Sequence, residues 1–147
     1  MNQTIVLDAA PLGLATNPNA NEINRKCLQW VLHKAGLGCT IIIPEIIDYE
    51  VRRELLRANK MKGLERLDEF IGRFIYLPIN TNAMRLAAQV WALARQQGKP
   101  AAPDHALDAD MLLIGQYKSL GDEQAVIATT NQKHLISFVR AELWTEI

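Results

Sequence analysis

The sequence has few of the features that would mark a specialised class of protein. It has only two cysteines, Cys27 and Cys39, in no CxxC or CxxH spacing, so a zinc site built on cysteine is not expected. Its longest apolar run is far shorter than the ~20 residues that span a bilayer. Its first residues also lack the basic and apolar regions of a signal peptide. We therefore expect a cytoplasmic protein without a membrane span.

An excess of charge of either sign is also absent. Lys and Arg together number 16, Asp and Glu together number 16, and the formal net charge is zero. This balance excludes a protein that binds nucleic acid through a generally basic surface, although equal totals can conceal separated patches. Hydrophobic residues make up 49% of the 147 residues, which argues against disorder. The length predicts a single domain, 1–147, that can bury a sizeable core.

Four short apolar runs without polar alternation predict strands that are buried on both faces, as in a parallel sheet. The runs are Thr4–Leu7, Thr40–Ile43, Phe74–Leu77 and Ala125–Ala128. A fifth strand is expected at an edge, near residues 143–145. Helical patterns lie between the strands, at about 23–35, 44–59, 64–70, 84–94 and 104–119, and a short helix is expected from Gln132. This alternation predicts a three-layer α/β/α sandwich with a central, mainly parallel sheet of four to five strands.

Polar residues follow two of these strands. Asp8 ends the first run and Asn131 comes just after the fourth, so both are expected at the carboxyl edge of the sheet, where such folds bind ligands. Each is equally compatible with a turn or a helix cap. Glu50 lies beside the apolar stripe of the helix at 44–59, where its carboxylate either is solvated or points into a polar cleft.

A third group of acids precedes an apolar stretch in the helix at 104–119. Asp104, Asp108 and Asp110 lie there without a nearby Lys or Arg, and Asp104 fits an N-cap. Asp108 and Asp110 are two positions apart, so at most one of them faces a given site. Carboxylates without cysteine or a histidine cluster suit a hard cation such as Mg²⁺ or Mn²⁺. The same acids are also compatible with a purely structural role.

In their order and placement, these motifs resemble a PIN-domain ribonuclease of the VapC type, the toxin of bacterial toxin–antitoxin pairs. The resemblance covers nearly the whole chain. It rests on Ile5-Val6-Leu7-Asp8, Tyr49-Glu50-Val51-Arg52, Asp110 to Gln116, and Thr129-Thr130-Asn131 with Lys133-His134-Leu135 behind it.

The resemblance implies a metal-dependent endoribonuclease in which Asp8, Glu50 and Asp110 hold Mg²⁺ or Mn²⁺. Asn131 matches the fourth catalytic position, where its amide would orient water or a carboxylate, and Thr129 would support it from the strand end. The metal would activate water and neutralise charge at the phosphorus. The resemblance also implies an antitoxin partner and a homodimer.

Two further acids have less defined roles. Asp108 is a candidate additional metal ligand, and Asp104 is expected to support the ligands from behind. The family often has Ser or Asn two residues after the first acid, whereas this chain has Ala10. This departure leaves open an alternative, a catalytically degenerate PIN domain that binds RNA or protein. A phosphotransfer domain is less favoured, because no Lys closes the fourth strand.

Basic residues should surround an acidic site that binds RNA. Between Arg52 and Arg66 there are six basic residues against two acids, which equally fits a solvated helix face. The candidates for substrate binding are Arg52, Arg53, Lys133 and His134. Arg52 or Arg53 could instead neutralise the acids.

Overall fold

Five strands form one fully parallel sheet in a computed structural model that describes residues 2–98 and 104–147, with residues 104–107 described by their backbone alone. The strand order is β3-β2-β1-β4-β5, so the first strand lies in the middle. The strands are β1 (Thr4–Leu7), β2 (Thr40–Pro44), β3 (Ile75–Leu77), β4 (Val126–Thr129) and β5 (Ala141–Leu143).

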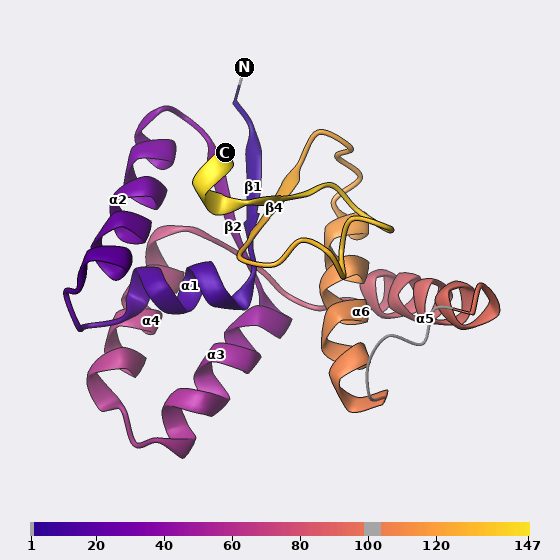
Figure 1. Cartoon of the computed structure of the whole chain (residues 1–147), viewed down its shortest axis with the longest axis horizontal. Helices are drawn as coiled ribbons and strands as arrows, with labels where there is room; N and C mark the ends of the chain where they lie inside the picture. The colour runs from indigo at the N-terminus through magenta and orange to yellow at the C-terminus, as the bar shows by residue number, and fades with distance from the viewer. Residues whose placement is uncertain (1, 99–103) are drawn as a thin grey trace.

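Helices cover both faces of the sheet (Figure 1). They are α1 (Ala9–Thr16), α2 (Glu22–Gly36), α3 (Glu45–Arg57), α4 (Met61–Arg73), α5 (Thr81–Gln96) and α6 (Asp104–Ser119). The chain steps outward from β1 to β3 through α1–α4, and then returns past β1 to β4 through α5 and α6. Because such crossovers share one hand, the reversal places α5 and α6 on the opposite face. The predicted three-layer α/β/α fold is confirmed.

The centre of the sheet is the core of the molecule. Ile5, Val6 and Leu7 of β1 have no exposed surface, and β4 is buried along its whole length. Strands covered by helices on both faces need apolar side chains at every position, which is why these runs do not alternate. The same burial leaves polar groups room only beyond the strand ends.

The structure differs from the sequence-based expectations in three places. The helix α1 was not predicted, because its sequence AAPLGLAT is apolar or neutral all round and shows no amphipathic stripe. The short helix expected from Gln132 is wrong, since residues 133–138 form turns. The edge strand is Ala141–Leu143, slightly earlier than expected, and a 3₁₀ helix follows it at Trp144–Glu146.

Across the described part of the chain, no helix combines the length and the hydrophobicity that crossing a bilayer requires.

Candidate active site

Asp8 lies where the first strand meets its helix, and both of its carboxylate oxygens accept hydrogen bonds. Oδ1 accepts from the N–H of Ala9 at 2.8 Å, so Asp8 is the N-cap of α1. Oδ2 accepts from the hydroxyl of Thr129 at 2.7 Å, at the end of β4. β1 and β4 are neighbours where the chain reverses its direction across the sheet, which is the usual ligand site of open α/β sheets. Asp8 is therefore fixed at the expected functional edge.

Glu50 approaches the same place from α3, the helix that follows β2. Burial raises the pKa of its carboxyl group, and repulsion from Asp8 and Asp110 raises it further. The positive charges of Arg53 and His134 oppose this increase in the pKa. Among the described residues, no hydrogen-bond donor meets the Glu50 carboxylate. Its position depends on α3 alone.

Asp110 completes the group from α6. Burial raises the pKa of its carboxyl group, His134 opposes the increase, and repulsion from Asp8 adds to it. Nε2 of His134 lies 3.6 Å from Oδ1 of Asp110. The structure thus brings together the three acids that the sequence motifs singled out, from a strand end and two helices far apart in the chain.

The three carboxylates interact through space without converging to ligating distance. Within residues 2–98 and 104–147, no group of three or more His, Cys, Asp or Glu side chains is close enough to hold a metal ion as it stands. The donor chemistry nevertheless fits a hard divalent cation, since carboxylate oxygens are the ligands that Mg²⁺ and Mn²⁺ prefer. Burial is the main cause of the raised pKa values of Glu50 and Asp110, and repulsion between the acids, which such an ion would remove, adds to it.

The segment after β4 lies against this acidic group. The hydroxyl of Thr129, a buried residue, accepts from the N–H of Asn131 at 3.2 Å while it donates to Asp8. The side-chain oxygen of Asn131 accepts from the backbone N–H of Lys133 at 3.3 Å. The hydroxyl of Thr129 therefore contacts both Asp8 and the backbone of Asn131. The side-chain oxygen of Asn131 instead bonds within the turn, to the backbone of Lys133.

The two further acids are placed differently. Asp108 is exposed and lines a cavity of about 420 Å³ between α5 and α6, together with Met84, Trp91 and Met111. It is thus turned toward α5, as expected for a residue two positions from Asp110. The side chain of Asp104 lies outside the described residues.

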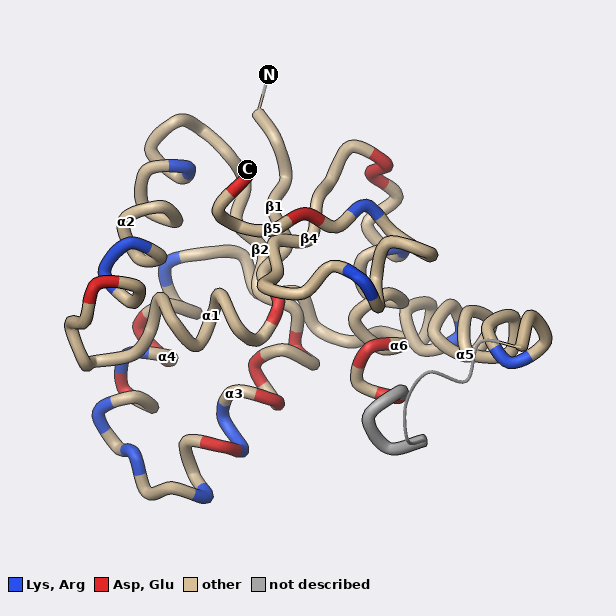
Figure 2. Tube along the Cα trace, in the orientation of Figure 1, with Lys and Arg blue, Asp and Glu red and all other residues tan. Residues whose placement is uncertain are grey.

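The predicted substrate-binding arginines lie on different sides of α3. The guanidinium of Arg52 contacts Asp48 at 3.0 Å and Asp68 of α4 at 2.7 Å. That of Arg53 lies over the ring of Tyr49, 5.1 Å from its centre, and close enough to Glu50 to lower the pKa of that acid. Basic residues gather around the α3–α4 turn, beyond the acids of α3 (Figure 2).

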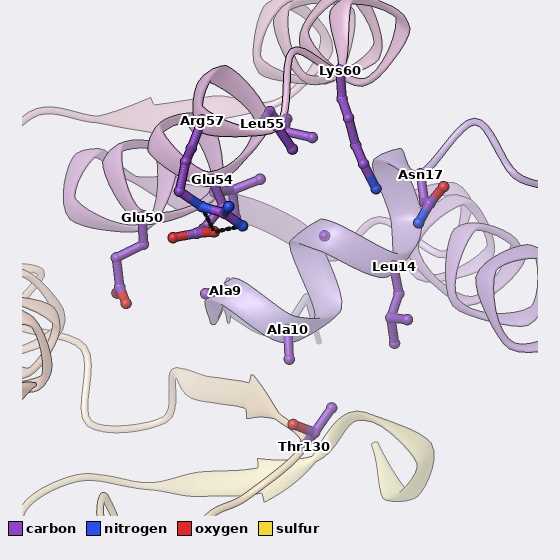
Figure 3. Close-up of a pocket in the computed structure, with 13 residues that line it drawn as sticks. Ala9, Ala10, Leu14, Asn17, Glu50, Glu54, Leu55, Arg57, Lys60 and Thr130 are labelled. Atoms are coloured by element: carbon purple, nitrogen blue, oxygen red, sulfur yellow. Dashed lines mark hydrogen bonds and ion pairs between the residues drawn. The ribbon is translucent and has the colours of Figure 1, made fainter.

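A groove of about 580 Å³ opens beside Glu50, between α1 and α3 (Figure 3). Its α1 wall is built from small residues, which leave space in front of α3. The main lining residues are Ala9, Ala10, Gly13, Leu14, Val51 and Leu55, with Arg57, Lys60 and Thr130 at the rim. Sequence reasoning missed this groove because it missed α1. The only available signal was Asp8 as an N-cap, with Pro11 in the first turn that follows.

Comparison with known proteins gives matches of structure but not of sequence. No protein-family model matches the chain, and no curated protein matches it by sequence. It is similar to a chain of VapBC2 from Rickettsia felis, bound in the crystal to a DNA fragment from their promoter, with a TM-score of 0.70 and 16% identity. That alignment covers 97% of this chain and 99% of the other.

Two other structures give the same result. DNA-bound VapBC from Salmonella typhimurium matches with a TM-score of 0.67 and 22% identity, over 98% of this chain and 99% of that one. VapBC-1 from nontypeable Haemophilus influenzae matches with a TM-score of 0.70 and 16% identity, over 97% and 99%. At such identities the likeness is one of fold. Over nearly its whole length, the chain has the PIN-like fold of chains in VapBC toxin–antitoxin structures.

Proposed function

We propose that the protein is a metal-dependent endoribonuclease, the toxin of a toxin–antitoxin pair. The observation that carries the proposal is the placement of Asp8, Glu50 and Asp110 around the carboxyl edge of the sheet, close enough for Asp8 and Asp110 to add to the burial that raises the pKa of Glu50. The fold likeness to VapBC structures supports the toxin assignment and the existence of an antitoxin partner. The proposed substrate is RNA and the proposed location is the cytoplasm. The proposed oligomeric state is a homodimer.

The mechanism assigns Mg²⁺ or Mn²⁺ to the three carboxylates, where it would activate water and stabilise charge on the phosphodiester. Thr129 orients Asp8 through its 2.7 Å hydrogen bond. His134 lies beside Asp110, where it can contact a phosphate. Arg53, whose guanidinium lies over the ring of Tyr49, and Lys133 are the remaining members of the predicted substrate-binding set that would attract RNA phosphates. The turn at Asn131 leads to His134, which lies beside Asp110, so Asn131 contributes to the site by shaping this turn.

The test is cleavage of total RNA by the purified protein in Mg²⁺, Mn²⁺ or EDTA. We expect cleavage with either ion, none in EDTA, and none for folded Asp8→Asn or Asp110→Asn. The matched control is Glu123→Gln, which removes an exposed acid before β4, at the opposite edge of the sheet. Equal cleavage by Asp8→Asn and the parent protein would contradict the proposal. Asp108→Asn, in the same assay, decides whether Asp108 is an additional ligand.

A catalytically degenerate PIN domain that binds RNA or protein is the second candidate. It is favoured by Ala10, by the neutral Asn131, and by the separation of the three carboxylates in the described structure. Calorimetric titration with Mn²⁺ separates the two. A nuclease should bind Mn²⁺ in the millimolar range or tighter and lose that binding in Asp8→Asn, whereas a binding module should show no such site.

A further inference from the structure

Gln116 is a polar residue buried completely within the apolar part of α6. Its side-chain amide makes two hydrogen bonds to two other elements. Oε1 accepts from the N–H of Ile46, in the first turn of α3, at 3.1 Å. Nε2 donates to the carbonyl of Leu77, at the end of β3, at 2.6 Å. One side chain thus joins α6, α3 and the carboxyl end of an edge strand.

The start of α3 needs such a partner. The first N–H groups of a helix have no acceptor within the helix, and the N-cap residue of α3, Pro44, provides no side-chain hydrogen bond. Gln116 supplies the acceptor from another helix. A buried N–H without a partner costs free energy. The position of α3 in which Ile46 keeps this bond is therefore favoured over shifted positions in which the bond is lost.

The bond joins the two helices that carry the less constrained acids. Glu50 lies one turn beyond Ile46 on α3, and Asp110 lies on the same helix as Gln116. The separation of the two carboxylates therefore depends on how α3 is fixed against α6. Neither carboxylate accepts a hydrogen bond of its own within the described chain, although Nε2 of His134 lies 3.6 Å from Oδ1 of Asp110, so the packing of the helices largely determines where they point.

We propose that Gln116 is a positioning residue that fixes α3 against α6 and so limits how far Glu50 and Asp110 must move to reach a shared metal. The inference rests on the proposed function, since the separation has a purpose only if the acids bind a cation together. A second link limits how far α3 would move without it, because the carboxylate of Glu45 accepts from the N–H of Ile79 at 2.8 Å. Removal of the Gln116 amide should therefore loosen α3 rather than detach it.

The neighbouring residue offers a matched control. Tyr117 is buried in the same helix, and its hydroxyl donates to the carbonyl of Ala125 at 2.6 Å. This bond ties α6 to the amino edge of β4 and does not reach α3. Tyr117→Phe removes one buried hydrogen bond from α6 without touching the link to Ile46.

The first experiment compares Gln116→Met, which keeps the length of the side chain, with Tyr117→Phe. On the metal-free protein, amide exchange at Ile46 should be faster in Gln116→Met than in Tyr117→Phe, after both are corrected for their melting temperatures. Calorimetry should show Mn²⁺ binding about tenfold weaker in Gln116→Met, as for other residues that orient metal ligands. Tyr117→Phe should bind Mn²⁺ with the parent affinity. In RNA cleavage, kcat should fall in Gln116→Met while KM stays unchanged.

The second variant, Gln116→Glu, keeps the shape and provides a rescue by pH. When protonated, the new carboxyl group can still accept from Ile46 and donate to Leu77, whereas the ionised form repels the Leu77 carbonyl. Burial raises the pKa of such a group. The ratio of the variant's Mn²⁺ dissociation constant to the parent's should therefore be near one at mildly acidic pH and rise toward alkaline pH. The site acids titrate in both proteins, so their effect on Mn²⁺ binding cancels in this ratio. This variant also decides the question if Gln116→Met does not fold.

Unchanged exchange at Ile46 would overturn the inference, whether or not the protein binds metal. Equal Mn²⁺ affinity of the parent and the Gln116 variants would overturn it while leaving the proposed function intact. A parent protein that binds no Mn²⁺ contradicts the proposed function instead, and the inference falls with it.

Discussion

The three acids of the candidate site are held in two different ways. Asp8 is fixed by its neighbours, because one oxygen caps α1 and the other accepts from Thr129. Glu50 and Asp110 have no such donors in the described structure, and burial and repulsion raise the pKa of each. The comparison indicates that hydrogen bonds of the protein fix one acid, whereas the other two bear the cost of burial and repulsion, with His134 near Asp110.

The largest effect is expected from removing one of the two unstabilised acids. Asp110→Asn should abolish Mn²⁺-dependent cleavage, with a loss of at least about 100-fold, since even residues that only orient metal ligands cost 10–100-fold. The same variant should melt at a higher temperature than the parent without metal, because the repulsion and partial burial of the Asp110 charge outweigh its attraction to His134. Thermal unfolding with EDTA and with Mn²⁺ measures both effects. A lower melting temperature in EDTA would show that Asp110 is not destabilising.

Removing the donor that fixes Asp8 should have the next largest effect. Thr129→Val should lower kcat about 10-fold or more and cost about 1 kcal/mol of unfolding free energy for the lost hydrogen bond. Thr130→Val is the control, because it changes the adjacent, exposed threonine. Steady-state cleavage and chemical denaturation give the two values. Parent-like kcat in Thr129→Val would mean that the cap on α1 alone suffices to place Asp8.

Because the pKa values of Glu50 and Asp110 are raised, we expect these two acids to lower the free energy of unfolding as the pH rises. A carboxyl group with a lowered pKa has the opposite effect. The folded, metal-free protein binds protons at Glu50 and Asp110 more tightly than the unfolded chain does, so its stability falls as pH rises through the raised pKa values. In EDTA, the parent should lose stability relative to Glu50→Gln as the pH rises from about 4 toward neutrality. Excess Mn²⁺ should reverse the difference at neutral pH. A difference that is independent of pH would show that Glu50 titrates normally.

The smallest effects are expected from the two arginines of α3. Arg52 is held by Asp48 and Asp68, so Arg52→Ala should cost up to about 1 kcal/mol of stability and change RNA binding little. Arg53→Ala should weaken RNA binding modestly and lower the slope of log K against log salt by about 1. Binding at several salt concentrations separates the two. The reverse pattern would move the RNA path to the α4 side of α3.

Much of this arrangement could be predicted from the sequence because it depends on local patterns. Buried strands are visible as apolar runs, and Asp8 lies directly after one of them. Glu50 and Asp110 could be placed on helices, but their approach to each other depends on packing between distant segments. The helix α1 escaped prediction because its face toward the groove carries apolar residues and glycine, so no polar stripe marks the helix in the sequence. The segment after Gln132 begins like a helix, since the N–H groups of Leu135 and Ile136 both donate to the Gln132 carbonyl. It does not continue as a helix, and no local pattern indicates where it stops.

The role of Gln116 was hidden for a similar reason. An amide within an apolar helical run suggests a residue at the edge of a buried face, and nothing local indicates that it bonds to Ile46, 70 positions earlier. Only the folded chain shows which backbone groups lack partners and which side chain reaches them. The sequence therefore predicted the acids and their edge of the sheet, but not the parts that hold α3 in place.

The hydrogen bond between Asp8 and Thr129 joins residues 121 positions apart. Because β4 is the neighbour of the central strand, a growing chain that ends at α6 still lacks the strand that completes the sheet around β1. Contacts of such long range form late, after the cost of closing the intervening loop has been met. The first acid of the site thus stays without its hydroxyl partner until β4 has been made. On the proposed function, a nascent chain without β4 lacks the hydrogen bond that orients the first acid of its site.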